Sequence, residues 1–251
     1  MNPWLHSSGV NVAAKREFAW TDLLLRYRAR VDWPARCAVV IPCHNEEAAL
    51  QPLLDKVVQF LPKVFVVDDG SSDGTAAAAR TAGAFVLVHE RQLGKGAALQ
   101  TGLKHALQTG FAWAITLDGD GQHDPSEIPL FLRKAEAEPI DLLVGNRMGQ
   151  SWQMPWLRRW INRWMSLRLE KLTGAELPDS QCGFRLIRLS AWARLPIRSR
   201  HYEIESELLV AMLRAGHRVD FVPIQCKYLR EKSGIHPIVD SWRWLKWYWQ
   251  A

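Results

Sequence analysis

Thr116-Leu117-Asp118-Gly119-Asp120-Gly121-Gln122-His123 is the stretch around which the chain is organised, and the apolar run Phe111-Ala112-Trp113-Ala114-Ile115 leads into it. The run predicts a buried strand, and the following Asp124-Pro125 is typical of the N-cap and first residue of a helix. Asp118 and Asp120 therefore stand at the carboxyl end of a predicted strand. Paired carboxylates at that edge of a parallel sheet suit Mg²⁺ or Mn²⁺ with a diphosphate. The alternative is a Gly/Asp-rich turn without chemistry, and the rest of the chain decides between the two.

Short apolar runs and helix patterns alternate along the chain on both sides of this stretch. The predicted strands are 37–42, 64–67, 84–88, 111–117, 140–144 and 219–224, and the predicted helices are 45–61, 75–82, 94–108, 125–137 and 203–214. Because the links are short, the pattern predicts an α/β fold with an open, mostly parallel sheet and helices on both faces. Polar clusters follow several strands, at the edge where such sheets bind ligands.

Two segments combine tryptophan with basic residues. In residues 152–164 a tryptophan recurs every four positions, which predicts a helix with its tryptophans largely on one side. This helix either packs on the sheet or lies at a bilayer interface, where Trp and Arg suit the headgroup level. The amphipathic C-terminal tail, 236–251, is aromatic and basic throughout. We expect it to dock on a membrane surface or on a membrane-protein partner.

Composition narrows the class of ligand without choosing it. Among the 251 residues, 32 Lys and Arg stand against 26 Asp and Glu, so the formal charge is +6. This charge suits an anionic ligand or an acidic membrane surface. Nucleic acid is not the expected partner, because the basic residues form no dense run. The four cysteines show neither the spacing of a zinc site nor a disulfide framework, and we expect reduced thiols. No segment approaches the ~20 apolar residues of a membrane span.

Five motifs, in this order, resemble those of the family 2 glycosyltransferases with the A-type fold. They are Ile41-Pro42-Cys43-His44-Asn45-Glu46-Glu47, Val67-Asp68-Asp69-Gly70-Ser71-Ser72-Asp73-Gly74-Thr75, Gly94-Lys95-Gly96, Leu117-Asp118-Gly119-Asp120-Gly121-Gln122-His123, and Asp179-Ser180-Gln181-Cys182-Gly183-Phe184-Arg185 followed by Glu203-Ile204-Glu205. The last is similar to the polyprenol-phosphate (dolichol-phosphate) sugar transferase branch. The resemblance implies a glycosyltransferase domain over residues 37–235, and an N-terminal extension, 1–36, and the tail, 236–251, lie outside it. Within the extension, apolar residues with basic residues between them predict a short amphipathic helix at 17–30.

The resemblance also implies a nucleotide-sugar donor, UDP- or GDP-linked, and inversion at the sugar carbon. A divalent metal, Mg²⁺ or Mn²⁺, neutralises the departing diphosphate in this chemistry. Asp118, Asp120 and Gln122 offer hard oxygen ligands from one turn. Lys95 stands at a helix start, where backbone N–H groups also bind phosphate. The donor-binding residues implied by the family are Pro42, Asn45, Glu46, Asp69, Lys95, Asp118 and Arg147.

The acceptor decides which further residues take part in catalysis. A lipid phosphate is already anionic near pH 7 and needs no general base, whereas a hydroxyl needs one within hydrogen-bond reach. Asp179, then Glu203 and Glu205, are the candidate bases. Arg147 and Arg185 are candidates for binding phosphate, and the alternative for each is a structural ion pair. The expected catalytic residues are Asp120, Asp179 and Arg185, and the expected acceptor or phosphate contacts are Arg185, Arg230 and Lys232.

The leading hypothesis is a metal-dependent transferase that acts on polyprenyl phosphate or another lipid. We expect it to work in the cytoplasm, peripherally on the cytoplasmic face of the inner membrane. The C-terminal membrane helices common in the lipid-phosphate branch are missing from this sequence, which keeps other acceptors open. One alternative is the same donor chemistry with a hydroxyl acceptor, such as a glycolipid, a polysaccharide or a pigment-type molecule. Another is a non-catalytic subunit that binds nucleotide sugar.

Overall fold

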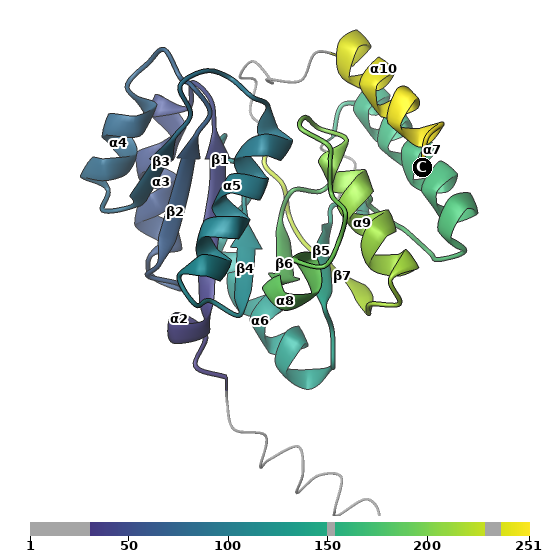
Figure 1. Ribbon diagram of the computed structural model, residues 1–251, viewed down its shortest axis with the longest axis horizontal. Coiled ribbons are helices and arrows are strands. Elements are labelled where there is room, and N and C mark those ends of the chain that lie inside the picture. The colour runs from purple at the N-terminus through teal and green to yellow at the C-terminus, as the bar shows by residue number, and fades with distance from the viewer. Residues whose placement is uncertain (1–30, 150–153, 229–236) are drawn as a thin grey trace, which may run out of the picture. The chain divides into compact units, whose positions relative to one another are not determined.

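A seven-stranded sheet forms the centre of the protein in a computed structural model that describes residues 31–149, 154–228 and 237–251 (Figure 1). The strand order is β3-β2-β1-β4-β6-β5-β7. The strands are β1 (Cys37–Cys43), β2 (Val64–Asp68), β3 (Phe85–Val88), β4 (Trp113–Thr116), β5 (Leu142–Asn146), β6 (Arg185–Arg188) and β7 (Val219–Pro223). Only β6 runs antiparallel to its neighbours among the described strands. The predicted α/β fold with a mostly parallel sheet is confirmed.

The crossover helices lie on both faces of the sheet. The helices α3 (Glu47–Val57) and α4 (Thr75–Thr81) carry the chain from β1 through β2 to β3, and α5 (Lys95–Gln108) returns it to β4. Because parallel crossovers are right-handed, this reversal of direction puts α5 on the opposite face, and Figure 1 shows α5 in front of the strands. The remaining helices are α2 (Trp33–Arg36), η1 (Pro125–Glu127), α6 (Ile128–Ala137), α7 (Trp156–Thr173), α8 (Leu189–Trp192), α9 (Ile204–Arg214) and α10 (Pro237–Tyr248).

The sheet places three polar loops at one edge. All seven residues of β1 are buried, as expected for a strand with helices on both faces. The register pairs Cys43, the last residue of β1, with Asp68, the last residue of β2, while Val40 of β1 pairs with Thr116 of β4. The loops that follow these strands therefore meet beyond their carboxyl ends.

One strand was not predicted from the sequence. No strand is predicted for Leu186-Ile187, which follow the motif at 179–185, but β6 forms there and inserts between β4 and β5. Two apolar residues are too few to show the alternation that predicts a strand. An antiparallel strand also needs no crossover helix, so no helix pattern in the sequence indicates its presence. The predicted strand at 111–117 is also shorter, since β4 begins at Trp113.

The tryptophans of α7 and α10 divide into packed and exposed side chains. Trp244 of α10 is 2% exposed, its indole N–H donates to Ser206 Oγ at 2.8 Å, and its ring lies 5.5 Å from that of Trp164 on α7. Other tryptophans point into solvent; these are Trp156 (78% exposed) and Trp160 (61%) on α7, Trp242 (69%) on α10 and Trp249 (82%), which directly follows α10. The tryptophans of these segments therefore include both packed and exposed side chains.

Some expectations fall outside the described residues, namely the helix at 17–30, Trp152, Arg230 and Lys232. Residues 32–251 form one compact unit, which includes both α2 and α10. The four cysteines are free and buried. In the described part of the chain, every helix is too short or too polar to cross a bilayer.

Gly102 lets α5 approach the sheet closely. A Cβ at this position would collide with Val40 of β1 and lie 3.1 Å from a methyl group of Val67 of β2. We expect Gly102→Ala to lower the free energy of unfolding by about 1 kcal/mol, because overpacking of roughly 1–3 kcal/mol outweighs the gain in helix propensity. Urea unfolding measures the change. Adding Val40→Ala should recover part of the loss, whereas stabilisation by Gly102→Ala alone would show that the contact is loose.

Candidate active site

A pocket of about 510 Å³ lies beyond the carboxyl ends of β1, β2 and β4, and we call it the strand-end pocket. Ligands of open parallel sheets bind at this edge. The residues expected from the sequence that line it are Pro42, Glu46, Asp69, Lys95, Asp118 and Asp120. The fold therefore gathers four separate segments of the chain around one space.

Lys95 joins two carboxylates at one wall of the strand-end pocket. Its ammonium Nζ lies 2.7 Å from Asp118 Oδ1 and 2.7 Å from Glu205 Oε1. Burial disfavours the charged ammonium, but the two carboxylates outweigh this effect and raise the pKa of Lys95. Burial likewise opposes ionisation of Asp118, yet the adjacent ammonium holds the pKa of Asp118 well below its usual range. Asp118 is thus ionised and fixed in direction before any ligand arrives.

Asp120 has a different electrostatic environment. Burial and then the neighbouring charge of Asp118 raise the pKa of Asp120, and its Oδ1 accepts a hydrogen bond from the backbone N–H of Gln122 at 3.1 Å. The two carboxylates therefore form a like-charge pair. Of the two, only Asp118 has an ammonium group in direct contact. Among the described residues, no cluster of three or more His, Cys, Asp or Glu side chains is arranged to hold a metal ion.

Glycine is required on both sides of the Asp118 carboxylate. A Cβ on Gly183, just before β6, would lie 2.6 Å from Asp118 Oδ1. A Cβ on Gly119 would lie 2.6 Å from Cys43 Sγ at the end of β1. A larger side chain at position 183 would displace the Asp118 carboxylate. A larger side chain at position 119 would displace Cys43 at the end of β1.

Asp69 shapes the loop that leads into α5. One carboxylate oxygen accepts from the backbone N–H of Leu93 at 2.9 Å and lies 2.7 Å from His89 Nδ1, while the other accepts from Gly94 N–H at 2.8 Å. Gly94 has a positive φ of 103° and precedes Lys95, so Asp69 fixes the start of α5 and with it the lysine. Asp69 lines the strand-end pocket while it does so.

Asn45 and Gln122 are not among the lining residues of the strand-end pocket. The side chain of Asn45 accepts from Ser72 N–H at 2.9 Å, and its backbone N–H donates to Ser71 Oγ at 2.9 Å. Asn45, with a φ of 57°, therefore ties the loop after β1 to the loop after β2. Gln122 lies two residues beyond Asp120, and its backbone carbonyl accepts from Lys227 N–H at 2.9 Å.

Arg147 and Asp179 form a buried, bidentate ion pair away from the strand-end pocket. Arg147 donates from Nε to Asp179 Oδ2 at 2.7 Å, from Nη2 to Oδ1 at 2.8 Å, and from its backbone N–H to Oδ2 at 3.1 Å. Asp179 is fully buried and Arg147 is 5% exposed. Burial would raise the pKa of Asp179, but the guanidinium lowers it. Both oxygens of the expected general base are thus occupied by Arg147.

Arg185 is buried beneath its own turn rather than turned toward a phosphate. Its guanidinium donates to three backbone carbonyls, those of Cys182 at 2.7 Å, Glu205 at 2.7 Å and Ser180 at 3.0 Å. Burial lowers the pKa of Arg185. The three bonds tie the turn before β6 to the start of α9.

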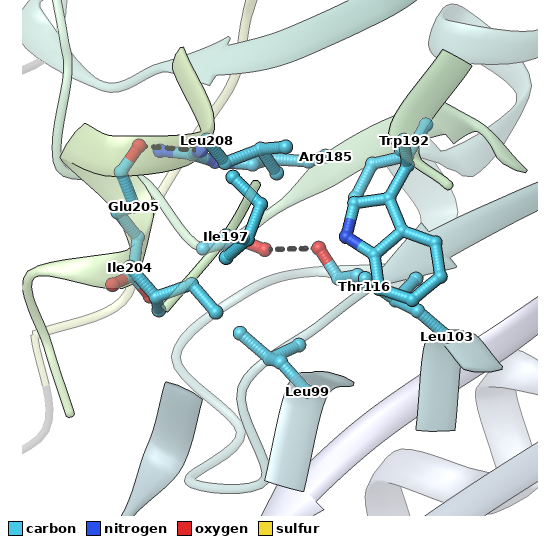
Figure 2. Close-up of a pocket in the computed structure, with 11 residues that line it drawn as sticks. Leu99, Leu103, Thr116, Arg185, Trp192, Ile197, Ile204, Glu205 and Leu208 are labelled. Atoms are coloured by element: carbon cyan, nitrogen blue, oxygen red, sulfur yellow. Dashed lines mark hydrogen bonds between the residues drawn. The ribbon is translucent and has the colours of Figure 1, made fainter. Parts of the chain in front are cut away.

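Figure 2 shows a cavity beside Arg185 and Glu205. None of the residues that line the strand-end pocket also lines this cavity. Its volume is about 20 Å³, room for a single water, and Leu99, Ile204 and Leu208 make its wall largely apolar. A substrate does not fit there. The cavity therefore marks loose packing between α5 and α9 and not a second site.

Several residues that line the strand-end pocket were not predicted from the sequence, among them His201 and Tyr202 from the segment before α9 and Arg243 from α10. Burial, together with the charge of Asp118, raises the pKa of Tyr202 to about 12, so the phenol stays protonated as a hydrogen-bond donor. The segment that carries His201 packs closely on the start of α5, where a Cβ on Gly96 would lie 2.7 Å from the backbone of Arg200. This contact joins residues far apart in the chain, so the sequence holds no local signal for His201, and it holds none for Arg243.

Comparison with known proteins identifies the family. Residues 38–195 match the family model described as glycosyl transferase family 2. An undecaprenyl-phosphate mannosyltransferase of Micrococcus luteus is 30% identical over 202 residues, which cover 75% of this chain and 82% of that protein. A UDP-N-acetylglucosamine–dolichyl-phosphate N-acetylglucosaminyltransferase of Methanococcus voltae is 28% identical over 213 residues, which cover 76% of this chain and 85% of that protein.

Solved structures agree on the fold. The crystal structure of glucosyl-3-phosphoglycerate synthase from Mycobacterium tuberculosis with Mn²⁺, UDP and phosphoglyceric acid is similar with a TM-score of 0.67. The two sequences are 21% identical, and the match covers 84% of this chain and 75% of that one. At this identity the likeness concerns the fold alone. Together with the family match over most of the sheet, these relatives confirm the resemblance seen in the sequence: the chain belongs to glycosyl transferase family 2 and is a glycosyltransferase.

Proposed function

We propose that this chain transfers a sugar from a UDP- or GDP-linked donor to polyprenyl phosphate, with inversion at the sugar carbon and with Mg²⁺ or Mn²⁺. The observation that carries the proposal is the strand-end pocket, where Asp118 and Asp120 line a space of about 510 Å³ beside Lys95. The acceptor is supported by relatives named as undecaprenyl-phosphate and polyprenol transferases. The metal is supported by the Mn²⁺ and UDP of the similar synthase.

In this proposal the donor lies across the ends of β1, β2 and β4. Pro42, Glu46 and Asp69 face its nucleoside, because they line the part of the pocket formed by the first two strands. The diphosphate lies near Lys95 at the start of α5, where the positive end of the helix dipole favours phosphate. The buried ammonium then stabilises the negative charge of the leaving diphosphate.

Asp118 and Asp120 fit a divalent cation. Both line the same pocket with hard carboxylate oxygens, which Mg²⁺ and Mn²⁺ prefer. The like charge that raises the pKa of Asp120 is the kind of imbalance that a cation relieves. We propose the amide oxygen of Gln122 as a further ligand. When bound, the ion neutralises charge on the departing diphosphate.

A phosphate acceptor suits the carboxylates of the site. An oxygen of the acceptor phosphate attacks the sugar carbon, the bond from that carbon to the diphosphate oxygen breaks, and the nucleoside diphosphate leaves with the electron pair. No proton has to be removed, because the phosphate is already anionic. Two of the three expected bases hold cations, since Asp179 pairs with Arg147 and Glu205 pairs with Lys95. The third, Glu203, is not among the residues that line the strand-end pocket. The geometry therefore favours a phosphate acceptor over a hydroxyl.

We also propose that exposed tryptophans of α7 and of the C-terminal segment hold the enzyme at the membrane that contains its acceptor. Trp156 and Trp160 on α7, Trp242 on α10 and Trp249 just after α10 are all more than half exposed. Indole rings and arginines partition to the headgroup level of a bilayer. Arg159 and Arg163 alternate with the exposed indoles of α7 and would meet anionic headgroups.

Replacing Asp120 tests the metal site. We expect Asp120→Asn to lower nucleotide release by at least about 10²-fold with saturating Mn²⁺, nucleotide sugar and a short-chain polyprenyl phosphate, because a charged ligand is lost where negative charge develops. The release of nucleoside diphosphate is measured directly. Asp55→Asn, on the exposed side of α3, is the matched control and should keep full activity. Full activity in Asp120→Asn would remove the proposed site.

Asp179 tests whether the acceptor needs a base. We expect Asp179→Asn to lower the free energy of unfolding by roughly 3–5 kcal/mol, because it leaves the charge of Arg147 buried and unpaired. Replacing both partners, as Asp179→Leu with Arg147→Met, should restore much of the stability and with it transfer to polyprenyl phosphate. A stable Asp179→Asn protein that binds donor but transfers nothing would instead identify Asp179 as a base.

The membrane proposal has a vesicle test. We expect Trp242→Ser with Trp249→Ser to reduce cosedimentation with phosphatidylglycerol-containing vesicles by about tenfold or more, because each indole that leaves the bilayer loses about 1.5–3 kcal/mol. Phe85→Ser, on edge strand β3 and 53% exposed in the native protein, is the control. Unchanged binding of the double variant would assign these tryptophans another role. Trp244→Ser should lower stability, since that ring is buried.

A further inference from the structure

A second hollow, of about 810 Å³, lies beside the strand-end pocket, and we call it the basic groove. Its walls come from the segment 194–203, from α9 and from α10. His201 and Arg243 line both the basic groove and the strand-end pocket. The two spaces are therefore neighbours that meet at these side chains.

The basic groove has cationic side chains that the protein does not neutralise. Five basic residues line it, namely Arg194, Arg198, Arg214, Arg243 and Lys246. Arg243 pairs with Asp240 at 3.2 Å, and Arg214 donates to the backbone carbonyl of Ala251 at 2.6 Å. In the described parts of the chain, the charged groups of the other three make no ion pair or hydrogen bond.

The acids of the groove leave it with an excess of positive charge, since Glu203 and Glu207 stand against five Arg and Lys residues. The carboxylate of Glu207 accepts hydrogen bonds from the backbone N–H groups of Arg198, at 3.1 Å, and Ser199, at 2.7 Å. Glu207 thus holds the backbone that carries Arg198 at the groove. An excess of cations around a hollow attracts and orients an anionic ligand.

The groove also has an apolar side. Leu195, Pro196, Val210 and Trp247 line it together with the cations. A phosphate joined to an alkyl or isoprenoid chain would use both kinds of wall, whereas a small phosphorylated acid would use only the cations. The lining of the groove, with both cationic and apolar side chains, therefore suits a phosphate that carries an apolar chain.

Helix α10 aligns the groove with the proposed membrane face. Arg243, Lys246, Trp247 and Gln250 follow helical spacing and line the groove. Trp242 of α10 and Trp249, which directly follows the helix, do not line the groove and are 69% and 82% exposed. Helix α10 and the residues that follow it thus carry both groove residues and exposed indoles.

Of the residues expected to bind phosphate, Arg230 and Lys232 lie outside the described residues, and the guanidinium groups of Arg185 and Arg147 are engaged by the protein itself. Arg185 donates to three backbone carbonyls, and Arg147 is held by Asp179. The groove supplies cations that are not so engaged, next to the pocket in which the sugar must be transferred.

We propose that the basic groove binds the phosphate of an amphiphilic phosphomonoester, the acceptor of the transferase proposed above, on which this inference rests. Arg194, Arg198 and Lys246 receive the phosphate, and the chain lies against Leu195 and Trp247. Arg243 lies where the groove meets the strand-end pocket and guides the phosphate toward the sugar carbon.

Binding of dodecyl phosphate tests the groove without any need for turnover. We expect calorimetry, below the micellar concentration, to show that the wild-type protein binds dodecyl phosphate and not dodecanol. Arg198→Gln with Lys246→Gln should weaken this binding by at least about tenfold, because each charge-assisted bond contributes about 1.5–3 kcal/mol. Arg80→Gln with Lys56→Gln, on α4 and α3, removes the same charge at exposed sites outside both spaces and should bind as the wild type does.

Steady-state kinetics of transfer distinguish a failure of the groove proposal from a failure of the proposed function. In the groove variant, KM for a short-chain polyprenyl phosphate should rise about tenfold while kcat and the affinity for nucleotide with Mn²⁺ stay unchanged. Equal dodecyl phosphate binding in the groove variant and the control would overturn the groove, even if nucleotide binding and transfer persist. Glycerol phosphate binding as tightly as dodecyl phosphate would overturn the amphiphilic assignment in favour of a soluble phosphoester. Loss of metal-dependent nucleotide binding in the wild type would count against the proposed function instead.

Discussion

The contact on which the site depends is the buried ammonium of Lys95 between Asp118 and Glu205. Asp118 follows β4 and Glu205 lies in the first turn of α9, so one lysine joins the two halves of the fold. Charges taken out of water are stable only with good partners, and an unpaired one is costly. Asp69 adds to this constraint because it fixes Gly94 and thus the backbone that carries the lysine. The electrostatics of the pocket are therefore organised before a donor binds.

The sequence predicted those parts of the molecule in which local pattern and global structure agree. Continuous apolar runs such as that of β1 are typical of strands buried between helices, which is why the α/β class and the mostly parallel sheet could be predicted. Strand β6 was not predicted, because its formation depends on pairing with β4 and β5 and not on its own residues. In the site, motif spacing identified Asp118, Asp120 and Lys95, since these follow strand ends or begin a helix.

The partners of buried charges were beyond the reach of sequence reasoning. Asp179 and Arg185 stand in a motif of a sugar-transferring family, and Arg147 follows a predicted strand, but the sequence alone does not show whether a guanidinium contacts a ligand, a carboxylate or a carbonyl. The structure shows a carboxylate for Arg147 and three carbonyls for Arg185. Arg243 was missed for a related reason, because α10 returns to a pocket built more than a hundred residues earlier in the chain.

The proposed binding of donor and acceptor by different parts of the chain has an evolutionary consequence. The expected donor contacts that line the strand-end pocket all precede residue 121, whereas the basic groove is built entirely from residues after 193. The Lys95–Glu205 pair is the main charged link between these halves. Recombination between relatives within the intervening segment would exchange acceptor range while retaining donor choice, provided that both parents keep that lysine and that glutamate. The architecture is in this sense modular, and new acceptors are accessible to it without redesign of the nucleotide-binding half.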